Sequence, residues 1–177
     1  WVAVIAVGAI AGASAAGVYG AASRFIAAGL IVDTALRVVV APMLSRHHGR
    51  GDTVALIALH RVATHWLVLF STPVFIALAI YAETWLSLVG PAFTEGATVL
   101  SLMCVGALVT FFAGNIHSVL LMSGKSGLAA LNKLCVVLLS ILLIILLTPT
   151  LGILGAAIAW CIASITDAML ATLEVRY

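Results

Sequence analysis

The chain has 177 residues, of which 64% are hydrophobic and only 8% are charged, and its mean hydropathy is +1.30. Soluble domains carry about 25% charged residues, so this composition excludes an ordinary soluble domain and indicates a membrane protein. The net charge of +2 comes without any run of Lys or Arg, which excludes a nucleic-acid-binding surface.

Apolar runs long enough to cross a bilayer follow one another along the chain. A hydrocarbon core of roughly 30 Å needs about 20 helical residues. The sequence therefore predicts one partial and five full spans, at 2–16, 21–44, 62–82, 97–121, 128–148 and 153–173. Turn-forming stretches separate them: "AGVYG", "SRHHGRGD", "VGPAFTEG", "SGKSG" and "TPTLGILG". The expected fold class is all-α, a polytopic transmembrane helical bundle of about six spans. Because the chain opens at Trp1 within an apolar run, we expect a fragment of a longer membrane protein.

Basic residues are unevenly distributed among the loops. Arg46, Arg50 and Arg61 surround the second loop, and Lys125 and Lys133 surround the fourth. The third and fifth loops hold no Lys or Arg. Since Lys and Arg favour the cytoplasmic side, loops two and four are expected to be cytoplasmic and loops three and five external.

The second loop has a distinct composition. Residues 45–61 are predicted to form a cytoplasmic loop with an interfacial helix, because this stretch is less apolar than the spans yet leads into the apolar residues Val54, Ile57, Leu59 and Val62. Four histidines lie in or beside this stretch without the spacing of a metal site: His47, His48, His60 and His65. No metal or other cofactor is expected. The three cysteines stand alone in separate spans, which is typical of small buried apolar residues: Cys104, Cys135 and Cys161.

Small residues predict where the helices pack closely. One stripe in the span 97–121 runs through Gly106, Thr110, Gly114 and Ser118, and a second, in the last span, through Gly155, Ala159, Ala163 and Asp167. Helices in lipid associate through such residues because their backbones can approach. The stretch "VVLLSILLIILL" is apolar all round and is expected to face lipid widely.

Asp33 and Arg37 place two opposite charges inside the second span. Between Phe25 and Val40 lie nine large apolar residues, which favour insertion by roughly 3 to 5 kcal/mol in total. Each charge costs about 2.5 to 3.5 kcal/mol at mid-helix, so the pair needs shelter. At a spacing of four residues the two groups can pair with each other. Two interpretations stay open: a structural ion pair, or a pair lining a hydrophilic cavity where Arg37 contacts an anionic group.

Three further polar residues are candidates for lining such a cavity. Arg24 lies near the predicted external start of its span, on the side where basic residues are unusual, although snorkelling to lipid headgroups explains it equally well. Asn115 and His117 lie deep in the span 97–121, where an interhelical hydrogen bond is the alternative. The candidate substrate-binding or cavity-lining residues are thus Arg24, Asp33, Arg37, Asn115 and His117.

Enzyme motifs are missing from the sequence. It contains no GxSxG, no HExxH, no phosphate-binding loop and no close pair of carboxylates. We therefore expect a protein that is not an enzyme.

Several stretches occur in an order typical of one group of transporters. They are "GVYGAASRF", "VAPMLSR", "STPVFIAL", "LVGPAFTEGATVLSLM", "NIHSVLLMSGKSGLAALNKL" and "LTPTLGILGAAIAW". From Ala16 onward the chain resembles the C-terminal half of bacterial polysaccharide-biosynthesis (O-antigen type) flippases. These belong to the multidrug/oligosaccharidyl-lipid/polysaccharide exporter superfamily.

The resemblance implies that residues 1–177 form the C-terminal transmembrane lobe of a two-lobed transporter in a bacterial plasma membrane. Its substrate would be an undecaprenyl-pyrophosphate-linked oligosaccharide, flipped by alternating access. Its partners would be the bilayer, the N-terminal lobe and glycosyltransferases or a polymerase. Two alternatives are a cation-coupled multidrug or metabolite antiporter of the same superfamily, with Asp33 as the coupling acid, and a non-transporting scaffold for glycosyltransferases. A lipid-linked pyrophosphate needs cationic groups, for which Arg24 and Arg37 are the candidates.

Overall fold

The structure is a computed structural model that describes residues 2–112 and 126–175. All regular elements in this part of the chain are helices, which confirms the all-α prediction. They are α1 (Val2–Ala11), α2 (Ala13–Gly29), α3 (Ile31–Gly49), α4 (Thr53–Ile80), α5 (Ala82–Ser87), a 3-10 helix (Pro91–Gly96), α6 (Ala97–Phe111), α8 (Ser126–Leu151) and α9 (Ile153–Val175).

Five helical segments are long and apolar enough to cross a membrane. They are Ala13–His47, Val54–Ile80, Pro91–Phe111, Ala129–Leu151 and Ile153–Leu173, and the shorter apolar helix Val2–Ala11 precedes them. The chain is therefore a multi-pass membrane protein, as its composition predicted.

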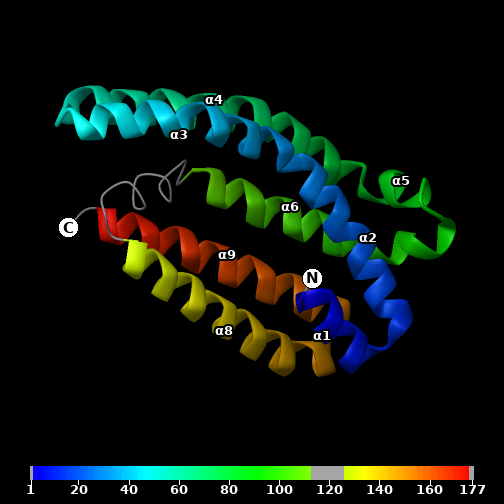
Figure 1. The fold of residues 1–177 in the computed structure, drawn as a ribbon. Helices are drawn as coiled ribbons and strands as arrows, with labels where there is room; N and C mark the ends of the chain where they lie inside the picture. The colour runs from blue at the N-terminus through cyan, green and yellow to red at the C-terminus, as the bar shows by residue number, and fades with distance from the viewer. Residues whose placement is uncertain (1, 113–125, 176–177) are drawn as a thin grey trace.

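The helices are arranged as two antiparallel pairs joined through α6 (Figure 1). α3 and α4 form one long hairpin, and α8 and α9 form the other. α6 contacts α4 on one side and α9 on the other, while α1 packs against α2 and α8. The tip of the α3–α4 hairpin and the first turn of α8 lie at one end of the molecule, and α5 lies at the other. The basic α3–α4 turn and the start of α8, which carries Lys133, are thus at the same end.

The first two predicted boundaries are wrong. The stretch "AGVYG" was predicted to separate the first two spans, but it lies inside α2. The break is at Gly12, whose φ of 92° is a left-handed conformation that residues with a Cβ rarely adopt. Gly17 and Gly20 stay helical, and Val4 of α1 packs close to Gly20. The second span is correspondingly longer than predicted and bends at Leu30, between α2 and α3.

The α3–α4 connection is also shorter than predicted. Helix α3 continues to Gly49 and α4 begins at Thr53, so the residues expected to form an interfacial helix are the first turns of α4. Asp52 caps α4, because its Oδ1 accepts a hydrogen bond of 3.0 Å from the amide of Ala55. Gly51, with φ of 69°, completes the tight turn.

Close helix contacts occur where the small-residue stripes predicted them. A Cβ added at Gly106 of α6 would lie 2.5 Å from Cys161 Sγ of α9, so only glycine permits this approach. A Cβ at Gly155 would lie 2.4 Å from the carbonyl oxygen of Leu147, where α9 folds back on α8. Ala159 and Ala163 are buried, as the stripe on α9 predicted. Gly114 and Ser118 lie outside the described residues.

Helix α8 exposes a wide apolar face, as expected from its composition. Its exposed side chains are large and aliphatic: Leu131, Leu134, Val137, Leu138, Leu142, Ile145, Leu146 and Leu151. Cys135 lies on the same open surface, so its expected burial is wrong, whereas Cys104 and Cys161 are buried as predicted. Because α8 packs against its neighbours along one side only, few of its positions are buried, and Cys135 lies on the exposed side.

Candidate functional site

Helix α2 exposes a surface unlike that of any long helix around it. Its exposed residues are Ala13, Ser14, Gly17, Arg24, Ala27 and Ala28. No large hydrophobic side chain is exposed between Ile10 and Ile31, whereas α8 exposes eight. Lipid-facing helices present large aliphatic side chains, and small residues with a charge face protein or water instead. The exposed side of α2 is therefore not an ordinary lipid-facing surface.

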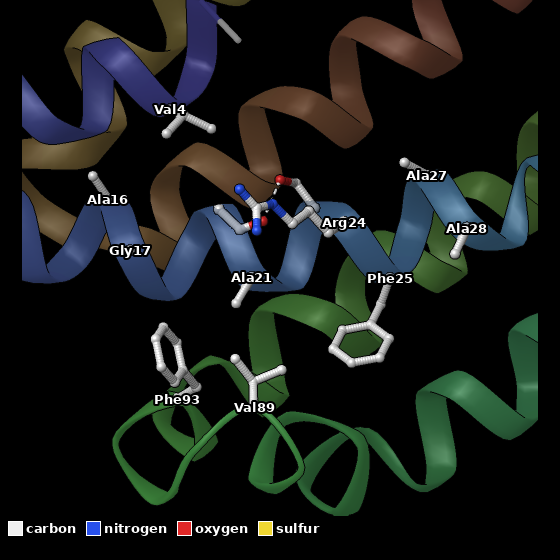
Figure 2. A pocket seen from close by; sticks show the side chains of 12 residues that line it. Val4, Ala16, Gly17, Ala21, Arg24, Phe25, Ala27, Ala28, Val89 and Phe93 are labelled. Atoms are coloured by element: carbon white, nitrogen blue, oxygen red, sulfur yellow. Dashed lines mark hydrogen bonds between the residues drawn. The ribbon is translucent and has the colours of Figure 1, made fainter.

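A hollow of about 850 Å³ lies along this side of α2 (Figure 2). Val4 of α1 borders it on one side of the helix, and Val89 and Phe93 border it on the other. The Arg24 side chain lies between them and is the only charged group among the lining residues. Ser23 also lines the hollow, but its hydroxyl donates to the carbonyl of Gly20 at 2.8 Å.

The packing of α2 explains why this side stays open. Its opposite side carries the buried residues Tyr19, Ala22 and Ile26, which belong to the main core. At Gly29 a Cβ would lie 2.7 Å from the ring of Phe75, so α2 and α4 approach closely there. Because one side of α2 is fixed against the core, Ala27, Ala28 and Arg24 are held on the other.

Asp33 and Arg37 form the ion pair that their spacing predicted. Arg37 Nε lies 2.9 Å from Asp33 Oδ2. The Asp33 side chain is 10% exposed and that of Arg37 is 41% exposed. Asp33 shares a helical face with Val40 and Leu44, which are buried in a small core between α3 and α4. The carboxylate is thus largely enclosed, whereas the Arg37 side chain is partly exposed although its Nε atom is buried.

The two arginines stand at different depths. Thirteen residues separate Arg24 from Arg37, which is about 20 Å along the α2–α3 helices at 1.5 Å per residue. Arg37 lies nearer the hairpin tip, at the end with the basic loops, and Arg24 lies nearer the opposite end. A single phosphate or pyrophosphate group cannot contact both, so the sequence-predicted candidates do not form one site. Asn115 and His117 lie outside the described residues.

One further charged pair was missed by reasoning from the sequence. Lys133 Nζ of α8 contacts Asp167 Oδ2 of α9. In the sequence, Lys133 is recognisable only as a basic residue flanking the fourth loop, where a lysine near a helix end reaches the headgroups by default. The signal was present in Asp167, which lies on the small-residue stripe of α9 and therefore had to face a neighbouring helix. Clusters of three or more potential metal ligands do not occur among the described residues.

Comparisons with known proteins add no closer assignment. No family model matches the chain, and neither a curated protein nor a solved structure was found to be similar to it. The helices define the class of protein: a polytopic α-helical membrane protein, with five candidate spans and one short apolar helix within residues 2–112 and 126–175.

Proposed function

We propose that the chain is one lobe of a membrane transporter that flips an undecaprenyl-pyrophosphate-linked oligosaccharide across a bacterial plasma membrane by alternating access. One observation carries this proposal: the exposed surface of α2 consists of small residues and Arg24, and it borders a hollow of about 850 Å³. A charge on such a surface is stable where it meets water or an anionic group. The order of the motifs named above supports the same kind of transporter.

Arg24 and Arg37 supply positive charge at two levels of the proposed path. A pyrophosphate that moves along α2 and α3 would meet Arg37 first from the cytoplasmic side and Arg24 about 20 Å further on. Because Arg37 is paired with Asp33, its net attraction for an anion is weaker than that of Arg24, for which no ion pair occurs among the described residues. Successive weak sites suit transport, since cargo must also leave.

The antiporter alternative has less support from the described residues. It requires an acidic residue that is available to a coupling cation, and Asp33 is the deep acid it would use. That carboxylate is enclosed and already holds Arg37 at 2.9 Å. The scaffold alternative requires a docking surface in the cytoplasmic loops, and the α3–α4 turn has only a few residues.

Thiol labelling in intact membranes tests whether the α2 surface borders water. In a background without the three native cysteines, Ala27→Cys should react with a membrane-impermeant thiol reagent. Leu142→Cys, an exposed position on α8, is the matched control and should stay unlabelled. If Ala27→Cys is as unreactive as the control, the surface is covered by lipid or protein and the proposed path is wrong.

Export measurements test the role of Arg24. Arg24→Ala in the full-length protein should reduce surface-polysaccharide export at least tenfold at unchanged membrane abundance, and Arg24→Lys should retain part of it. Arg50→Ala, at the exposed hairpin tip, is the control and should export normally. Normal export by Arg24→Ala would reject the assignment.

A further inference from the structure

A second hollow lies on the opposite side of the molecule from α8, between α4 and the end of α6. It has a volume of about 600 Å³ and is lined by Thr64, His65, Trp66, Val68, Leu69 and Phe112. Trp66 stacks on Phe70 one turn further along, with ring centroids 5.3 Å apart. In contrast to the α2 surface, this groove has large apolar walls, of which Trp66, Leu69 and Phe112 are exposed.

The length of α4 places this groove just inside the cytoplasmic boundary of the membrane. From Ile80, the last residue of α4, to Arg61 the helix rises about 28 Å, close to the roughly 30 Å of a hydrocarbon core. Tyr81 and Trp85 follow at the external end, as is typical of an interfacial aromatic belt. Arg61 therefore lies at the level of the cytoplasmic headgroups, and Trp66 lies about one turn deeper.

Positive charge dominates the mouth of the groove. Arg61 is exposed and lies one turn before His65, on the same side of α4. Helix α4 contains no Asp or Glu, and neither does α6. The two acids of the neighbouring hairpin are engaged elsewhere, since Asp33 pairs with Arg37 and Asp52 caps α4.

The hydrogen bonds around the groove leave Arg61 as its polar end. His65 Nδ1 donates to the carbonyl oxygen of Arg61 at 2.8 Å, which holds the imidazole ring along the helix. The hydroxyl of Thr64 donates to the carbonyl oxygen of His60 at 2.9 Å. Arg61, exposed one turn before the lining residue His65, is therefore the charged group next to the groove that a ligand can use.

We propose that this groove binds an anionic phospholipid of the cytoplasmic leaflet, with an acyl chain against Trp66, Leu69 and Phe112 and the phosphate at Arg61. The large side chains fit a flexible acyl chain, whereas a closely packed helix needs small residues at the contact. A zwitterionic lipid fills the apolar part equally well but gains less from Arg61. The site is separate from the α2 surface and does not depend on the proposed transport.

Fluorescence quenching by brominated lipids tests the site directly. A variant of the full-length protein that keeps Trp66 as its only tryptophan is reconstituted in phosphatidylcholine vesicles. Brominated phosphatidylglycerol or brominated phosphatidylcholine is then added. One basic residue near the surface contributes about 1 kcal/mol, so phosphatidylglycerol should bind at Trp66 about fivefold more tightly.

Three variants decide the outcome. Arg61→Gln should reduce the preference to near unity, and Arg61→Lys should keep it. Arg50→Gln removes a charge in the α3–α4 turn, beyond the start of α4 and about 12 Å from Arg61 along the helix, and should leave the preference unchanged. Equal quenching by the two lipids in the parent protein would show annular lipid only and would overturn the proposal. A fivefold preference that persists in Arg61→Gln would overturn it as well.

Discussion

The Asp33–Arg37 pair predicts an unequal response to removing either charge. Arg37→Gln leaves a carboxylate that is 10% exposed without its cation, whereas Asp33→Asn leaves a guanidinium whose side chain is 41% exposed. Breaking a buried pair from one side costs about 3 to 5 kcal/mol because the other charge is stranded. We therefore expect Arg37→Gln to lower the free energy of unfolding by an amount in this range. An exposed guanidinium on a flexible stem reaches water or headgroups, so for Asp33→Asn we expect about 1 to 2 kcal/mol.

The difference of about 2 kcal/mol is a roughly 30-fold change in the unfolding equilibrium. Reversible unfolding in mixed micelles of dodecyl maltoside and SDS measures it, with the mole fraction of SDS at the midpoint as the readout. The double variant Asp33→Asn/Arg37→Gln strands no charge and should unfold closer to the parent than Arg37→Gln alone. If Asp33→Asn is the more damaging single change, the carboxylate is not the enclosed member of the pair and the reasoning fails.

Two further predictions concern the contacts of α9. Gly106→Ala places a methyl group 2.5 Å from Cys161 Sγ and should destabilise the protein by about 1 to 3 kcal/mol, with partial rescue by Cys161→Ala. Gly127→Ala, where nothing lies within 4 Å, is the control and should be neutral or slightly stabilising in the same unfolding assay. Lys133→Gln should cost about 3 kcal/mol, because it removes the cation beside the Asp167 carboxylate, whose side chain is only 14% exposed. A cost below about 1 kcal/mol would contradict that estimate.

Hydropathy predicted that the chain consists of helical membrane spans, but it did not predict where each helix begins and ends. Apolar length predicts a span because an unpaired backbone cannot exist in lipid. It does not say which glycine breaks a helix. Gly12 and Gly17 look alike in the sequence, yet one has φ of 92° and the other lies inside α2. The choice depends on whether α1 can fold back against α2 and α8, a contact between distant parts of the chain.

For the candidate site, the sequence identified the candidate charged residues and predicted one ion pair, but it did not predict on which side of the molecule the charged residues lie. Spacing along one helix was sufficient for Asp33 and Arg37, because a pair four residues apart needs no tertiary information. Lys133 and Asp167 are thirty-four residues apart and lie on neighbouring helices. Predicting this pair requires knowing how α8 is rotated about its own axis, which the local sequence does not tell. The rotation of α2 about its axis likewise decides that Arg24 lies on the open side of that helix. No local sequence pattern specifies this rotation.

The contrast between the α2 surface and the α4–α6 groove bears on both proposals. A charge near the α2 hollow is surrounded by Ala27, Ala28 and Gly17, which offer an acyl chain little contact area. The charge of Arg61 lies next to a groove lined by Trp66 and Leu69, which offer an acyl chain a large contact area. The same residue type, arginine, therefore has different expected ligands in the two places: a hydrated anionic group at Arg24 and a lipid phosphate at Arg61. Lipid composition should accordingly change Trp66 quenching without changing the labelling of Ala27→Cys.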